Sequence, residues 1–158
     1  MSNSTLLPYE RISVVTQVGG LELTRAITFL GNTEYPSSQL LVDRVPTEQD
    51  GQALAGKSYR VHGDLARDLI TGICEYACEY WPDTAYHIEL GEGDLNVGEH
   101  YFLLAILAPS HQMAMDAADY LLRTIQKRIP VWFKNRWPDG SETAWVPMHD
   151  EQVQPLGV

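Results

Sequence analysis

Positive charge is scarce in this sequence. Its 158 residues include 11 Lys and Arg against 21 Asp and Glu, which gives a formal net charge of −10. General nucleic-acid binding depends on neutralising phosphates with basic side chains, so this balance argues against it. Five of the eleven basic residues nevertheless fall within fourteen positions, and such a cluster either holds one small anion or forms a solvated surface. They are Arg123, Lys127, Arg128, Lys134 and Arg136.

Cysteine is also scarce, since the chain contains only Cys74 and Cys78. Their spacing of four places them on one face of an expected helix, but a zinc site needs about four ligands. No nearby Cys or His completes such a set, and the five His show no close metal-ligand spacing, which disfavours a zinc hydrolase. We therefore expect both cysteines to pack in the core, and we expect no metal and no cofactor.

Long apolar runs are missing as well. The longest, residues 101–108, is far too short to span a membrane. The first five residues lack the basic start and apolar core of a secretion signal, so we expect a cytoplasmic protein. With 44% hydrophobic and 20% charged residues, and no repeat or linker, the chain is expected to be one domain over 1–158, with a core of 11–146 and a tail of 147–158.

Hydrophobic spacing predicts two long helices and several strands. The first helix begins near Gly63 with Asp64 as its N-cap, and ends at Pro82. The second follows a Ser110 cap, buries a stripe of alanines and leucines, and ends at Pro130. Strands are expected at 11–16, 23–30, 39–45 at an edge, 57–62, 84–90 half-buried, and 101–108 at the centre. Two helices on a mostly antiparallel sheet give an α+β domain.

Within these elements, two further expectations concern the first helix and a polar stretch. The apolar face of the first helix is expected to comprise Leu65, Leu69, Ile73, Ala77 and Tyr80, which recur at helical spacing. The stretch 47–56 has little apolar content, so we expect it to be mobile.

A series of short motifs follows in a fixed order over residues 84–146. They read Gly-x-Leu-x-Val-Gly-Glu, then Ala-Pro before a helix, then Ile-Pro-Val-Trp, and finally Trp-x-Asp-Gly with a later Trp-Val. The residues that carry them are Gly93, Leu95, Val97, Gly98, Glu99, Ala108, Pro109, Ile129, Pro130, Val131, Trp132, Trp137, Asp139, Gly140, Trp145 and Val146. Thr28-Phe29-x-Gly31 and Glu79-Tyr80-Trp81-Pro82 match too. Over residues 11–146 the chain resembles the large, catalytic subunit of molybdopterin synthase.

The resemblance implies an α/β hammerhead-like fold and a homodimer. It also implies a small ubiquitin-like sulfur-carrier partner that inserts a C-terminal Gly-Gly thiocarboxylate into each large subunit. Two such sulfurs would pass to a pterin phosphate, cyclic pyranopterin monophosphate, to make the dithiolene of molybdopterin. This chemistry needs cations that hold a phosphate and stabilise oxyanions, and an amine near the terminal glycine.

Several positions depart from the family pattern. The two lysines of the family, one on the second helix and one after Pro-x-Trp, are Gln126 and Phe133 here, and its nearby glutamate is Asn135. The other substituted positions hold Thr33, Glu34, Leu90, Gly91, Ser110 and His111. The helix that family members usually carry between the first two strands is not expected, because the chain leaves no room for it.

The basic residues near the substituted positions form the candidate site. We predict Lys134, Lys127 and His111 as catalytic residues, and Arg128, Arg136 and Ser110 as substrate-binding residues. Lys127 lies one position past the expected lysine, and one residue turns a helical side chain by about 100°, so it does not simply replace that amine. Lys134 lies in a more irregular segment, where it can reach.

Three functional hypotheses remain open. One is a divergent sulfur-transfer subunit with a rearranged anion site. Another is a non-catalytic relative that keeps the dimeric fold and binds a partner protein, with Glu34, Gln126 and Phe133 in one pocket that repels phosphate. The last is an unrelated α+β binding domain, which requires the ordered motifs to be coincidental.

Overall fold

The computed structural model describes residues 11–148, over which three helices pack on a mostly antiparallel sheet. The main sheet has seven strands in the order β2-β7-β6-β5-β8-β9, with β1 joined in parallel to β6, and β3 and β4 form a separate hairpin. The elements are β1 Ile12–Val18, α1 Thr24–Leu30, β2 Ser37–Arg44, β3 Glu48–Gln49, β4 Gln52–Ala53, β5 Gly56–Val61, α2 Gly63–Tyr80, β6 Ala85–Asn96, β7 His100–Ala108, α3 His111–Arg128, β8 Val131–Arg136 and β9 Val146–Pro147. The α+β prediction is confirmed.

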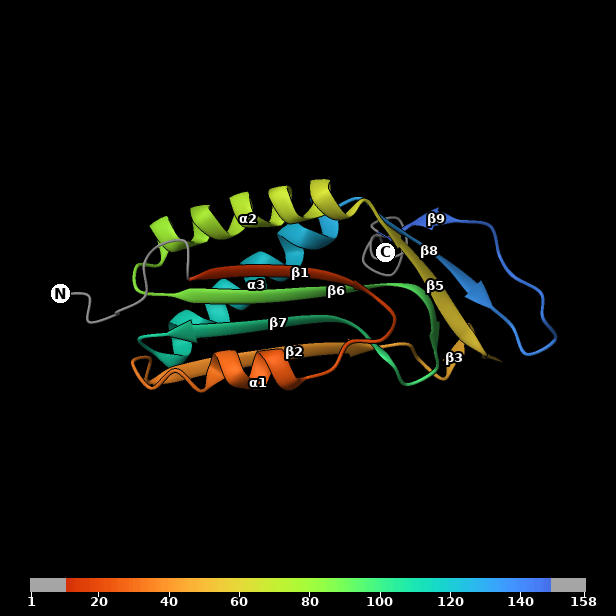
Figure 1. Cartoon of the computed structure of the whole chain (residues 1–158), viewed down its shortest axis with the longest axis horizontal. Helices are drawn as coiled ribbons and strands as arrows, with labels where there is room; N and C mark the ends of the chain where they lie inside the picture. The colour runs from red at the N-terminus through yellow and green to blue at the C-terminus, as the bar shows by residue number, and fades with distance from the viewer. Residues whose placement is uncertain (1–10, 149–158) are drawn as a thin grey trace.

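Helices cover both faces of the sheet (Figure 1). The long helices α2 and α3 lie on one face, and the largest apolar core fills the space between them and β6 and β7. The short helix α1 lies on the other face, where Ala26 packs against Leu103 and Ala105 of β7. As predicted, β7 is a central strand buried on both sides and β2 is an edge strand.

The segment 23–30 was predicted to be a strand, and that prediction is wrong because it forms α1. Its core contacts come from Leu23, Ala26, Phe29 and Leu30, which recur at helical rather than alternate spacing. The expectation that no helix fits between the first two strands is wrong for the same reason. This helix also buries the second face of β6, so the predicted half-buried strand is buried on both sides from Ala85 to Gly91.

The strand β6 joins two parts of the sheet. Its first half pairs with β7 and β1, whereas its last four residues, from Gly93 to Asn96, pair with β5. Gly93 has a φ of +92°, which a glycine adopts without strain. Beyond this point β5 and β8 slope across the end of the molecule, and the wing formed by β5, β8 and β9 projects past the helical layers (Figure 1).

The two long helices follow the predicted ranges, with one change of face. The side chain of Ser110 caps α3 by accepting from the Met113 N–H at 3.2 Å. The N-cap of α2 is His62, while Asp64 lies inside the first turn beside Arg67. The buried side chains of α2 are Ala66, Ile70, Ile73, Cys74 and Ala77, whereas the predicted Leu65 and Tyr80 are exposed. Small side chains at Ala66 and Ala77 let the helix approach the sheet closely.

The two cysteines differ in burial. Cys74 packs in the core as predicted, and burial raises the pKa of its thiol. Cys78 is half-buried, with its sulfur 3.8 Å from the carbonyl oxygen of Thr84. Within residues 11–148, no group of three or more His, Cys, Asp or Glu is placed to hold a metal ion.

The polar stretch 47–56 contains β3 and β4, joined through Asp50 and Gly51 at positive φ. Two such residues suit the tight turn of a two-residue hairpin. Its mobility stays a prediction. Among the helices of the described part of the chain, none is long and apolar enough to cross a membrane.

Candidate functional site

The predicted site residues fall into separate places on one chain. Ser110 and His111 stand at the start of α3, and Lys127 and Arg128 at its end. A helix of 18 residues is about 27 Å long, so these two pairs cannot meet on one small substrate within a single chain. All four residues are exposed.

The strand β8 separates its side chains by alternation. Val131, Phe133 and Asn135 are buried, whereas Lys134 and Arg136 lie on the other side of the strand. The Lys134 Nζ is 2.8 Å from a carboxylate oxygen of Glu142 and 4.9 Å from the centroid of the Trp145 ring. Lys134 is thus held on the face opposite Phe133, in contacts of its own.

Arg136 packs across the backbone of β5. Its guanidinium donates to the carbonyl oxygen of Leu95 at 2.7 Å, while its Nε is buried and has no hydrogen-bond partner in the described residues. Gly56 makes this possible, because a Cβ there would lie 2.4 Å from the Arg136 Nη2 and 2.2 Å from the Leu95 oxygen. Arg136 is therefore fixed against the sheet.

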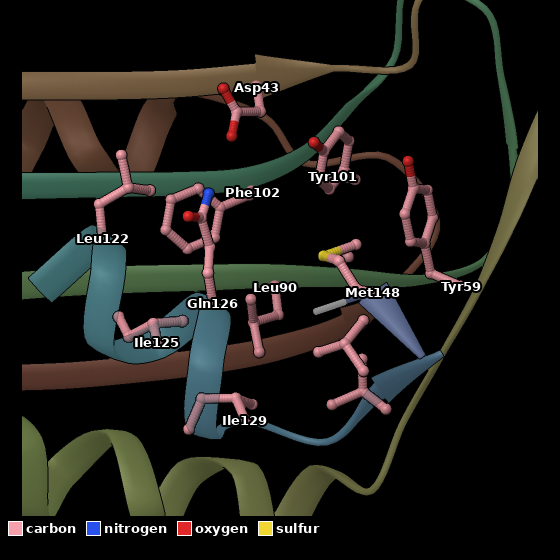
Figure 2. A pocket seen from close by; sticks show the side chains of 13 residues that line it. Asp43, Tyr59, Leu90, Tyr101, Phe102, Leu122, Ile125, Gln126, Ile129 and Met148 are labelled. Carbon is pink, nitrogen blue, oxygen red and sulfur yellow. The ribbon is translucent and has the colours of Figure 1, made fainter. Parts of the chain in front are cut away.

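A mostly apolar pocket lies where the end of α3 meets β5 and β8. Its cavity volume is about 30 Å³, room for about one water molecule. Gln126 extends from α3 toward Phe102, and Met148 lies between Leu90 and the tyrosines (Figure 2). The lining residues are Asp43, Tyr59, Val61, Leu90, Gly91, Tyr101, Phe102, Leu122, Ile125, Gln126, Ile129, Val131 and Met148. Burial raises the pKa of the Asp43 carboxyl.

The expected pocket of Glu34, Gln126 and Phe133 does not form within one chain. Gln126 lines the cavity, but Glu34 and Phe133 do not. Glu34 lies three positions before Ser37, which pairs with Ala108 at the sheet end where α3 begins. Within a single chain these residues cannot share a pocket, because the α1–β2 turn and the end of α3 are at opposite ends of the fold.

Lys57 is the residue near the pocket that the sequence analysis missed. It lies two positions before Tyr59 on β5, is only 5% exposed, and its Nζ is 4.6 Å from the centroid of the Phe133 ring. Strand alternation could have found it, because Lys57 shares a face with Tyr59 and Val61 in the predicted strand 57–62. The signal in the sequence is a lysine at a strand position whose side chain is expected to point into the core.

A second group of buried polar side chains lies under α1. Glu89 is fully buried and accepts from Arg25 and from the His87 Nε2, each at 2.7 Å. The His87 Nδ1 is 3.0 Å from the Ser13 hydroxyl, and Phe29 stacks on the imidazole ring. The Glu89 partnership raises the pKa of Arg25. This group connects β1, β6 and α1.

Comparisons with known proteins match the chain to one protein family. A family model described as MoaE protein matches residues 41–128. The molybdopterin synthase catalytic subunit of Synechococcus elongatus is 24% identical over 143 residues, which cover 90% of this chain and 86% of that protein.

Solved structures give the same fold. A molybdopterin synthase structure from Staphylococcus aureus has a TM-score of 0.76 at 20% identity and covers 86% of this chain and 96% of that one. A protein–protein complex of subunits 1 and 2 of the molybdopterin-converting factor from Helicobacter pylori contains a chain with a TM-score of 0.65 at 13% identity, covering 79% of this chain and 84% of that one. At these identities the likeness establishes the fold.

Proposed function

The chain belongs to the MoaE protein family, and we propose that it acts as the large, catalytic subunit of a molybdopterin synthase. In this proposal it takes sulfur from the C-terminal thiocarboxylate of a small ubiquitin-like partner that ends in Gly-Gly, and passes it to cyclic pyranopterin monophosphate. Family membership is the observation that supports the proposal most directly. A complex of two subunits is also recorded for a structural neighbour. A cytoplasmic location belongs to the same proposal.

The cations at the end of α3 supply the anion chemistry of this proposal. Lys127 and Arg128 directly follow Gln126, which lines the pocket, and they are exposed where a phosphate can approach. Breaking an acyl–sulfur bond develops negative charge on oxygen, and positioned donors lower the energy of that state. Lys134 can join them only if it leaves Glu142, and Arg136 only if it leaves the Leu95 carbonyl.

Ser110 and His111 require a second copy of the chain in this scheme. They stand about 24 Å from Lys127 along α3, so within one chain they cannot share a substrate with it. We propose that the homodimer brings the start of α3 in one copy toward the pocket of the other. The site is then complete only in the dimer.

The second candidate is a non-catalytic relative that keeps the dimeric fold and binds a partner protein. The lining of the pocket favours it, since the cavity is mostly apolar, holds about 30 Å³ and presents an uncharged Gln126. A pterin phosphate does not fit that volume without movement of the lining side chains.

Reconstitution separates the two candidates. Purified chain is mixed with a thiocarboxylated small subunit and the pterin precursor, and molybdopterin is measured. We expect product, and the same mixture with a small subunit lacking its last two glycines serves as the control. Binding of the small subunit without any product, given an authentic partner, supports the non-catalytic candidate instead.

Lys134→Ala tests the predicted catalytic lysine in the same assay. Because the substitution removes a cation, we expect product formation to fall on the order of a hundredfold. Glu142→Gln, which removes the partner that holds Lys134, is the control and should leave activity at least at the level of the unchanged chain. Full activity of Lys134→Ala would remove this residue from the site.

A further inference from the structure

Four aromatic side chains meet on the outer surface between α2 and α3. Tyr76 and Tyr80 come from the last turns of α2, Trp81 follows that helix, and Tyr120 comes from α3. The ring centroids of Tyr76 and Tyr80 are 6.5 Å apart, and those of Tyr80 and Trp81 are 4.6 Å apart. The Tyr120 ring lies 5.7 Å from both Trp81 and Tyr76. The four rings form one continuous surface, the aromatic patch.

The aromatic patch has an inner half and an outer half. Trp81 and Tyr120 are half-buried and pack against the main core, so the fold accounts for them. Tyr76 and Tyr80 are instead 53% and 66% exposed. Tyrosine forms helices less readily than alanine, glutamate or lysine, so the helix itself does not favour these two residues. Exposed aromatic rings that lie together in this way are typical of a surface that binds another molecule.

The aromatic patch lies away from the pocket. The end of α2 is followed by the start of β6, where Ala85 pairs with Leu107, whereas the pocket is lined by Leu90 and Gly91 further along β6. Figure 1 shows this end of α2 and the wing at opposite ends of the molecule. The aromatic patch is therefore separate from the site of the proposed function.

The charge beside the aromatic patch is negative. Glu79 lies three positions after Tyr76, and Asp116 lies four positions before Tyr120, so each carboxylate is on the same helix face as a ring. Both acidic residues are exposed, and neither forms a salt bridge within residues 11–148. The sequence contains no lysine or arginine over residues 68–122, so the adjoining parts of α2 and α3 supply no cation.

Two further observations favour a cationic ligand at this surface. The carbonyl groups at the end of a helix carry partial negative charge, and the last turn of α2 has no basic residue that would balance it. On α3, Arg123 is the first arginine after Tyr120, and it is already paired with Asp119. A guanidinium can stack on an aromatic ring while it donates to a carboxylate, so an arginine of another molecule fits this surface.

We propose that the aromatic patch is a docking surface for a partner protein that presents a basic, arginine-containing segment. One arginine of that segment stacks on the outer rings of Tyr76 and Tyr80 and donates to the Glu79 carboxylate. Asp116, on the other helix, attracts a second basic residue of the same segment. This interaction is independent of sulfur transfer.

A peptide-binding experiment tests the docking surface. The probe is a twelve-residue peptide of four Gly-Ser-Arg repeats with both ends blocked, titrated into the full chain and followed by NMR of the tyrosine rings. We expect the ring signals of Tyr76 and Tyr80 to shift. The same peptide with lysine in place of arginine should bind several-fold more weakly, because an ammonium group does not stack on a ring as a planar guanidinium does.

Variants locate the binding on the aromatic patch. Tyr80→Ala should weaken binding of the arginine peptide about fivefold, whereas Tyr80→Phe keeps the ring and should bind as the unchanged chain does. Glu79→Gln should also weaken binding, because it removes the paired carboxylate. The matched controls lie near the start of the same helix, where Leu65→Ala removes an exposed apolar side chain and Asp68→Asn an exposed carboxylate. Both controls should leave the affinity nearly unchanged.

Several results would overturn the proposal. It fails if the unchanged chain binds neither peptide, or if Tyr80→Ala binds the arginine peptide as well as Leu65→Ala does. Equal affinity for the arginine and lysine peptides would mean that the surface responds only to net charge, which also contradicts it. A smaller mass by light scattering for Tyr80→Ala than for the unchanged chain would make the aromatic patch an interface between copies of the chain instead.

Discussion

A single position of strand register decides which cations can reach the pocket. On β8 the inward positions are Phe133 and Asn135, so Lys134 is turned to the other face and pairs with Glu142. On β5 the same alternation turns Lys57 inward. The residue type alone therefore says little about a site, and the parity of its position in the strand says more.

Gly56 is the residue whose replacement the structure resists most clearly. A methyl group there would lie 2.2 Å from the Leu95 carbonyl oxygen and 2.4 Å from Arg136, and backbone cannot move away cheaply. We expect Gly56→Ala to lower the free energy of unfolding by about 3 kcal/mol in urea denaturation. The control is Gly72→Ala on the exposed side of α2, where no atom lies within 4 Å, and it should raise stability by about 0.5–1 kcal/mol. Equal effects would contradict the packing described for Arg136.

The raised pKa of the Asp43 carboxyl predicts that the stability of the fold depends on pH. Burial raises the pKa of its carboxyl above the ordinary 3.8, so the folded chain holds this proton more tightly than the unfolded chain does. The stability that Asp43 contributes is therefore present below pH 3.8 and is lost as the pH rises through the raised pKa. We expect Asp43→Asn to raise the melting temperature at pH 7 and to change it little at pH 3. A variant that melts lower at pH 7 would show that a charged Asp43 is stabilised.

At the scale of elements, periodicity predicted most of the fold but not its second helical layer. The ranges of α2, α3 and β7 and the Ser110 cap followed from spacing and capping residues alone. Segment 23–30 did not, because a seven-residue helix and a strand place apolar residues on one face almost equally well. Because α1 was not predicted, β6 was expected to be buried on one face only. The sequence of a strand does not show whether a helix packs on its second face.

The same limit applies to the site. Sequence matching found Gln126, which lines the pocket, and the substituted Phe133. It could not find Lys57, because the segment before α2 is the weakest part of the resemblance. Sequence matching also could not show that the predicted site residues at the start and at the end of α3 lie far apart, because a motif carries no information on distance.

The polar group under α1 gives a prediction for an element. Glu89 is fully buried, and removing it leaves the His87 Nε2 and part of Arg25 without a partner under the helix. We expect Glu89→Ala to cost about 2 kcal/mol of unfolding free energy. Asp119→Ala is the matched control, because it removes an exposed carboxylate paired with Arg123 on α3, and it should cost less than about 0.5 kcal/mol. Equal losses would mean that α1 does not depend on this group.

At the scale of the whole molecule, the prediction concerns assembly. The predicted site residues at the two ends of α3 could share a substrate only between copies, so we expect light scattering to report about twice the chain mass of 17.8 kDa. Co-expression of His111→Ala with Lys127→Ala should restore product that neither variant makes alone, since one of the two sites in the mixed dimer then has both residues. A monomer that makes product would rule this arrangement out.

The strand β6 belongs both to the helical layers and to the wing, because its first half pairs with β7 and its last residues with β5. One continuous strand thus links the helical layers to the wing. Loosening at either end would disturb the hydrogen bonds of the other, so the protein should melt in a single cooperative transition.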